Sequence, residues 1–205
     1  MRKTLALSML LLVVIALGIH VSTAASVSVQ DADHGMGFWY RMAVRAVKAS
    51  RHAIRRAAYI IRERAGGGVD VSTSVKLLRA SVRIHKVAVA FLVNGNPRRS
   101  LLSASLSILV ARDSVRVASD NPEEAVSSIP SQVEAKIEEV RDLLNRLEDE
   151  GVDVTLPRRI LNLAERLNGR GGNLIAEGRV VQGVVAAEMG RMLAWLSQVI
   201  ASRST

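Results

Sequence analysis

The chain has 205 residues, a formal net charge of +9, no cysteine and only 3% aromatic residues. The lack of cysteine excludes disulfides, thiolate metal sites and cysteine nucleophiles. The scarcity of aromatic side chains argues against a platform that stacks nucleic-acid bases.

Residues 1–25 have the three-part layout of a secretory signal peptide. Arg2 and Lys3 precede an uncharged apolar run over residues 4–21, and small residues surround a cleavage point after Ala24 or Ala25. The run also approaches the length of a membrane-spanning helix. An uncleaved N-terminal anchor and a pilin-like leader therefore stay open as alternatives. Under each of them, we expect the rest of the chain to be secreted or extracytoplasmic.

Residues 26–36 are expected to form a flexible leader. Asp31, Asp33 and His34 carry oxygen and imidazole ligands close together, which makes them a weak candidate for a divalent-ion site. Terminal segments are usually poorly ordered and a fourth ligand is not evident. We therefore predict no metal and no cofactor.

A helix over residues 37–65 is predicted to be basic and amphipathic. Its basic residues recur at helical spacing, at Arg41, Arg45, Lys48, His52, Arg55 and Arg56. Phe38, Trp39 and Tyr40 stand at its start, and tryptophan and tyrosine favour the headgroup level of a membrane. Two interpretations compete: a core-facing helix with a solvated Arg face, and a helix that binds an anionic membrane or polyanion.

Charge divides the chain into two halves. From His34 to Ser119 there are 16 Lys or Arg against three acids, a net charge of +13, whereas Asp120 to Thr205 carries 10 against 14, a net charge of −4. This asymmetry indicates an anionic partner for the first half or docking of the halves on each other.

The sequence also contains an internal repeat, since an offset of 83 residues aligns Gly68–Ser119 with Gly151–Ser202 without a gap. Both copies carry a Gly-Val-Asp-Val corner, and Gly95 aligns with Gly178. Glycine at these places predicts left-handed helix ends. Asp70 or Ser72, and Asp153 or Thr155, are then placed to cap the following helices.

We therefore predict an all-α bundle of about six helices, built from two tandem three-helix units over residues 37–119 and 131–202. Residues 120–130 are expected to form the linker, with Ser131 and Glu134 as a capping box at the next helix. Further helices are expected near 73–94, 97–118, 131–149, 156–176 and 179–202.

The helical hairpins with a small glycine turn resemble the helical-hairpin repeats of uncharacterised exported archaeal proteins and, more distantly, tetratricopeptide-like arrays. The resemblance covers residues 68–119 and 151–202. The Trp, Tyr and Pro pattern of tetratricopeptides is missing, so the resemblance implies an architecture and no activity.

Two further features invite a functional interpretation. Gly169, Gly171 and Gly172 interrupt the predicted fifth helix and suggest a hinge, because each glycine costs about 1 kcal/mol relative to alanine in a helix interior. His85 is expected to be a partly buried structural histidine, because it falls in the apolar register of the predicted second helix with Val75, Leu78, Val82, Val89 and Leu92.

No catalytic motif is visible. We expect a non-enzymatic, exported helical-repeat protein that acts as a structural or interaction module at the cell envelope. The first alternative is a peripheral binder of anionic membrane or polyanion through the basic first helix, and the second is an N-terminally anchored or pilin-like assembly subunit. Its expected partners are a second copy, another envelope protein or an anionic surface. Neither a specific nucleic acid nor a small-molecule substrate is indicated.

Overall fold

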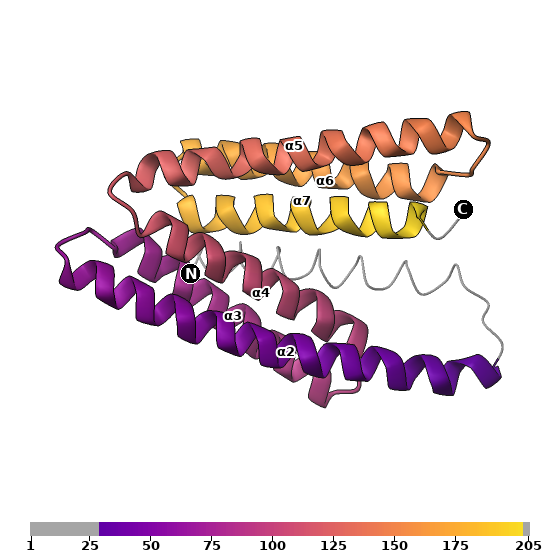
Figure 1. Ribbon diagram of the computed structural model, residues 1–205, viewed down its shortest axis with the longest axis horizontal. Helices are drawn as coiled ribbons and strands as arrows, with labels where there is room; N and C mark the ends of the chain where they lie inside the picture. Colours follow the sequence, from indigo (N-terminus) through magenta and orange to yellow (C-terminus); the bar gives the residue numbers. More distant parts are fainter. Residues whose placement is uncertain (1–28, 203–205) are drawn as a thin grey trace.

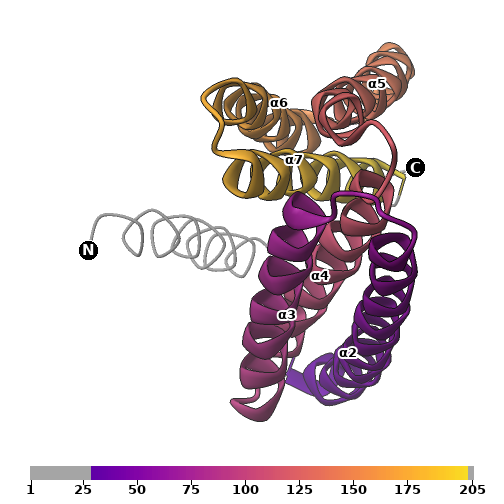
Figure 2. The ribbon, with the colours of Figure 1, turned by 90° about the vertical axis from the view of Figure 1, so that its left-hand side faces the viewer.

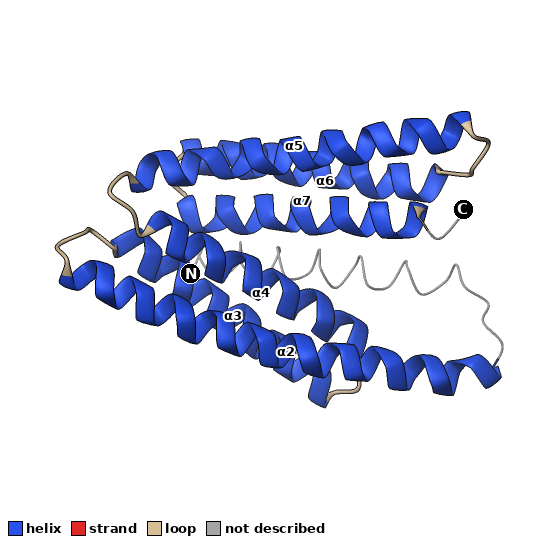
Figure 3. Ribbon diagram, in the orientation of Figure 1, coloured by secondary structure: helices blue, strands red, loops and turns tan. Residues whose placement is uncertain are grey.

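The computed structural model describes residues 29–202, and the side chains from Gly37 onward. The proposed signal at residues 1–25 lies outside this range. The described part forms six helices and no strand (Figures 1 and 3), which confirms the predicted all-α fold. The helices are α2 (Val29–Gly66), α3 (Ser72–Val93), α4 (Pro97–Val117), α5 (Pro122–Asp149), α6 (Thr155–Ala176) and α7 (Val180–Ala201).

The six helices form two three-helix units, α2–α4 and α5–α7, which are packed on each other. α3 and α4 make one hairpin and α6 and α7 the other, while α2 packs mainly on α4 and α5 packs on both α6 and α7. α7 lies against α3 and α4 (Figure 2), and α4 also contacts α5. Val110 and Val117 of α4 belong to the same apolar cluster as Leu193 of α7. The units therefore share one core.

Four helix ends use glycine in the way that the sequence predicts. Gly68, Gly95, Gly151 and Gly178 have φ between 71° and 87°, and no other described residue has a positive φ. After each of them, the next backbone N–H reaches back to a carbonyl of the last helical turn, as Val152 N does to Leu147 O at 2.9 Å. This is the Schellman arrangement, and the left-handed C-cap prediction is confirmed.

The predicted side-chain N-caps are not formed as expected, because Val71 and Val154 occupy the N-cap positions and give no side-chain cap hydrogen bond. The aspartates bond to the helix starts from one residue earlier. Asp70 Oδ1 accepts the backbone N–H of Ser72 at 2.8 Å, and Asp153 Oδ1 accepts that of Thr155 at 2.9 Å. Each carboxylate therefore satisfies one backbone donor at a helix start.

α5 corrects the expected linker at residues 120–130, because the helix already begins at Pro122. Pro122 occupies the first turn, where proline is favoured, and Glu123 and Glu124 follow it at the positive end of the helix dipole. The Ser131–Glu134 capping box is thus also wrong, since both residues lie inside the helix.

Burial explains why α5 continues through Pro130. An interior proline costs about 3 kcal/mol. The helix nevertheless keeps one apolar stripe on both sides of Pro130, and burial of each such side chain contributes about 1.5–3 kcal/mol. The buried stripe consists of Val126, Ile129, Val133, Ile137, Val140, Leu144 and Leu147.

Two more boundaries differ from expectation. α2 begins at Val29, so residues 29–36 of the predicted flexible leader continue the helix. α6 runs unbroken through Gly169–Gly172, so the predicted interruption is wrong. A Cβ on Gly171 would lie 2.8 Å from Gly183 O and 2.9 Å from Ala187 N. Gly171 therefore allows α6 and α7 to approach closely.

Among the described residues, α7 is the one helix long and apolar enough to cross a membrane by length and composition. However, 67% of its most apolar window is buried inside the bundle, as in a core helix. It also contains Glu188 and Arg191.

Candidate anion-binding face of the first helix

One side of α2 packs against the bundle through small residues. Ala43, Ser50 and Ala57 are almost fully buried and recur every seven residues, and Ile61 ends the row. Small side chains let the helix approach its neighbours closely, and α4 is its main contact. The side of α2 opposite this row is exposed to solvent.

The predicted basic residues lie on that open side. All six are exposed, namely Arg41, Arg45, Lys48, His52, Arg55 and Arg56. We call this set the α2 basic face. Its 16-residue span corresponds to roughly 22 Å of helix from the first residue to the last. The structure therefore places the predicted residues together on one exposed helix.

The predicted aromatic residues do not all share that exposure. Phe38 and Tyr40 are about half exposed, at 46% and 51%. Trp39 is more covered, because Phe38 packs edge-on against it at 5.6 Å and the guanidinium of Arg98 stands 5.2 Å from its ring centre. Trp39 thus ties the start of α2 to α4, while Phe38 and Tyr40 are available at the surface.

The positive charge of the first unit is left without ion-pair partners. Within the described residues, every salt bridge involves residues of the second unit or its turns, from Lys136–Glu139 to Arg191–Glu188. None involves α2, α3 or α4. Glu63 accepts a hydrogen bond from the Tyr59 hydroxyl at 2.5 Å, and Asp70 caps a helix.

His85 of α3 contacts α2, although the apolar register in which it was predicted to lie is not the most buried face of α3. It is half-buried, and its Nδ1 lies 2.6 Å from Ser50 Oγ of α2. Ser50 Oγ also lies 3.0 Å from Val47 O, and the tautomer of His85 decides which partner donates in the contact between Ser50 and His85. Burial, aided by Arg51, lowers the pKa of His85 and favours the neutral imidazole.

A buried carboxyl pair joins the two units. Asp113 of α4 is 6% exposed and Glu188 of α7 is 0% exposed. Arg191 Nη2 stands 3.0 Å from Glu188 Oε1, but neither Glu188 oxygen has a hydrogen-bond partner of acceptable geometry. The ion-pair contact alone therefore does not compensate for removing this carboxyl from water.

Burial consequently raises the pKa of Glu188 to about 8, and the adjacent Asp113 carboxyl raises it further than Arg191 lowers it. Burial also raises the pKa of Asp113. Like charges this close favour a shared proton, so the pair is protonated in part at neutral pH.

Other candidate residues have a more limited outcome. The side chains of Asp31, Asp33 and His34 lie outside the described ones, and the described residues hold no cluster of three metal-ligating side chains. Three acidic residues, Glu148, Asp149 and Glu150, stand at the end of α5, and Glu148 among them forms an ion pair with Arg158 of α6.

Sequence reasoning missed the Asp113–Glu188 pair and a cavity between the units. Glu188 had a visible signal, because it is an acid inside the most apolar helix of the described chain. The cavity had none, since its lining comes from three helices spread over residues 76–192.

The chain matches no protein-family model, no curated protein and no solved structure. Function is therefore argued from the site alone.

Proposed function

We propose that this chain is an exported, non-enzymatic helical protein of the cell envelope that docks on an anionic membrane surface through the α2 basic face. The observation that carries the proposal is the exposure of all six basic residues, together with the lack of ion-pair partners for them in the described part of the chain.

The neighbours of α2 strengthen the argument. α2 packs against α3 and α4, which are themselves basic, and has no comparable contact with the acidic second unit. Charges more than about 8 Å away are screened at physiological ionic strength. The acids of the second unit therefore do little to neutralise this face.

The aromatic residues favour a lipid surface over a soluble polyanion. Phe38 and Tyr40 are exposed near the start of α2, and Tyr59, 63% exposed, lies near its end. Tyrosine rings, with an apolar body and a polar tip, suit the membrane interface, and the apolar ring of Phe38 can enter the acyl boundary. A phosphate backbone would require only the charges.

We also propose that the two units are copies of one ancestral three-helix unit. Support comes from the helix starts, since α3 and α6 begin 83 residues apart, as do α4 and α7. The positive-φ glycines follow the same offset, Gly68 with Gly151 and Gly95 with Gly178.

Vesicle sedimentation tests the membrane proposal. The full chain should bind phosphatidylcholine vesicles that contain phosphatidylglycerol and should bind pure phosphatidylcholine much less. A basic residue near an anionic surface contributes about 1 kcal/mol, so Arg45→Glu with Arg55→Glu should weaken binding at least about thirtyfold.

The matched control reverses two exposed arginines of α6, Arg159→Glu with Arg170→Glu, which changes the net charge equally. It should retain most of the binding. If both double variants lose binding alike, net charge alone attracts the protein. If the α2 variant binds like the parent, the membrane proposal is wrong.

Export is tested separately by mass spectrometry of the N-terminus in the exporting cell. The proposed signal predicts a mature chain that begins just after Ala24 or Ala25. An intact Met1 would contradict cleavage and favour the anchor.

A further inference from the structure

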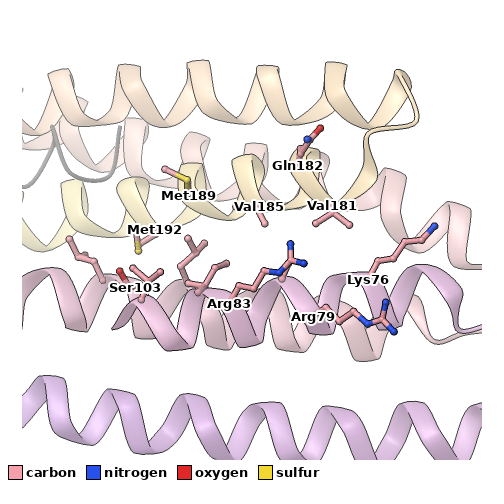
Figure 4. A pocket seen from close by; sticks show the side chains of 14 residues that line it. Lys76, Arg79, Arg83, Ser103, Val181, Gln182, Val185, Met189 and Met192 are labelled. Carbon is pink, nitrogen blue, oxygen red and sulfur yellow. The ribbon is translucent and has the colours of Figure 1, made fainter. Parts of the chain in front are cut away.

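A cavity of about 350 Å³ lies between the two units, at the place where α7 crosses α3 and α4 (Figure 4). Ligand pockets in proteins range over about 300–1,000 Å³, so this volume is sufficient for a small molecule. The site is distinct from the α2 basic face, because no residue of α2 lines it.

The interior of the cavity is apolar. Leu106 of α4 and Val185 and Met189 of α7 are buried side chains that line it, and Ser103 is the buried polar residue among the lining. Methionine at positions 189 and 192 provides unbranched, adaptable side chains on the α7 side (Figure 4). Such a surface suits a flexible hydrocarbon tail.

The rim on α3 is basic and has no acidic counterpart. Lys76, Arg79 and Arg83 line the cavity, and no Asp or Glu does. The three side chains are exposed, and none of them forms an ion pair or hydrogen bond within the described residues. Figure 4 shows Arg83 extending from α3 towards α7 beside Val185. The opposite rim carries neutral Gln182.

We infer that this cavity binds a single-chain amphiphilic carboxylate, with the tail among α3, α4 and α7 and the carboxylate at Arg79 and Arg83. An arginine fork pairs well with a carboxylate. An uncharged lipid would leave the basic rim unused, and a small inorganic anion would leave the apolar interior unfilled.

Calorimetric titration of the full chain with saturated carboxylates of increasing length tests the tail. From octanoate to laurate, each added methylene should strengthen binding about fourfold until the cavity is filled. Acetate and inorganic phosphate should not bind measurably. Equal affinity for octanoate and laurate would overturn the inference.

Two variants test the location. Ala80 is half-buried and lines the cavity, so Ala80→Phe should fill it and weaken laurate binding at least tenfold. Arg79→Gln with Arg83→Gln alters only exposed side chains and should weaken laurate binding about tenfold while leaving lauryl alcohol unaffected. Arg159→Gln with Arg170→Gln is the matched control and should bind laurate like the parent.

The outcomes separate this site from the membrane-binding face. Arg45→Glu with Arg55→Glu should bind laurate normally even where vesicle binding is lost. Loss of laurate binding in that variant would move the ligand to α2 and contradict the inference. If Ala80→Phe fails to fold by circular dichroism, the Arg79 and Arg83 variant decides, and unchanged laurate affinity there is a negative result.

Discussion

The two helical hairpins solve the same packing problem with different residues. In the α3–α4 hairpin, Ser100 Oγ donates to Ala88 O across the helices at 2.8 Å. At the positions 83 residues later, Gly183 faces Gly171, and a Cβ on Gly183 would lie 2.6 Å from Gly171 O. One hairpin is joined by a hydroxyl, while the other brings backbone against backbone.

The second crossing point repeats the contrast. Ser107 Oγ donates to Ser81 O at 3.0 Å in the first hairpin. In the second, a Cβ on Gly190 would lie 2.8 Å from Ala164 O. Both hairpins thus keep small residues wherever the helices cross, and the second has the tighter fit.

The two units also differ in the side chains that fill their cores and in the ion pairs on their surfaces. The second unit is filled by a long aliphatic stripe on α5 and carries ion pairs on its surface, such as Arg141–Glu165 at 2.6 Å. The first unit is packed largely through serine and alanine and leaves its cations unpaired. We infer that the second unit contributes most to stability and the first presents charge.

The largest expected effect on stability comes from a substitution in the core stripe of α5. Leu144 is fully buried, so Leu144→Ala should lower the free energy of unfolding by about 2–5 kcal/mol, because a cavity remains. Leu156→Ala removes the same atoms from an exposed position and should change it by less than about 0.5 kcal/mol. Urea denaturation measures both, and equal losses would refute the assignment of the core.

In the α6–α7 hairpin, replacing two glycines by alanine should change the free energy of unfolding in opposite directions. Gly183→Ala forces a methyl group against backbone atoms and should cost about 1–3 kcal/mol. Gly169→Ala meets nothing within 4 Å in the same hairpin and should stabilise the chain by about 0.5–1 kcal/mol, because alanine favours the helix.

Amide exchange adds a direct check of the glycine run. An unbroken α6 predicts protected amides across residues 169–172, whereas a hinge predicts fast exchange there. Fast exchange together with a neutral Gly183→Ala would restore the hinge and remove the contrast between the hairpins.

The carboxyl pair between the units gives a pH-dependent test. Burial raises the folded-state pKa of Glu188 to about 8, above its ordinary value near 4.5 in the unfolded chain. Between these values the folded state binds more protons than the unfolded state. Stability should therefore fall as pH rises through this window, by up to about 1.4 kcal/mol per pH unit.

Glu188→Gln is the matched variant for that titration, because glutamine has nearly the same shape as glutamate but cannot titrate. Its stability should vary less between pH 5 and pH 8 than that of the parent, as followed by urea denaturation. Burial also raises the pKa of Asp113, so an unchanged slope would mean that Asp113, and not Glu188, sets the dependence.

Most of the fold was predictable, because the glycines that end helices act through their own local backbone conformation. Gly68, Gly95, Gly151 and Gly178 set the turns through backbone conformation alone, and each was placed correctly. Large aliphatic residues gave the α5 stripe for the same reason, since their burial follows the helical period.

The serine-rich faces were less predictable, because a hydroxyl gives no hydropathy signal of burial. In α3 the apolar register through Leu78 and Val82 was expected inside, but Ser74, Leu77 and Ser81 are the buried residues. Pro130 and Gly171 caused a different error, because both residue types disfavour a helix and a break was predicted at each. Tertiary packing outweighs that preference, and α5 and α6 continue through these positions. The cavity required the crossing of α7 over α3 and α4, which no local pattern encodes.

The smallest predicted effect concerns the hydroxyl contacts of the first hairpin. Ser100→Ala should cost about 1 kcal/mol, because it removes one buried hydrogen bond but opens little space. Ser127→Ala removes a hydroxyl that bonds within its own helix on the exposed side of α5 and should be nearly neutral. If Ser100→Ala costs more than Gly183→Ala in the same urea series, the hydroxyl contact is the stronger joint, and the ranking of the two units must be reversed.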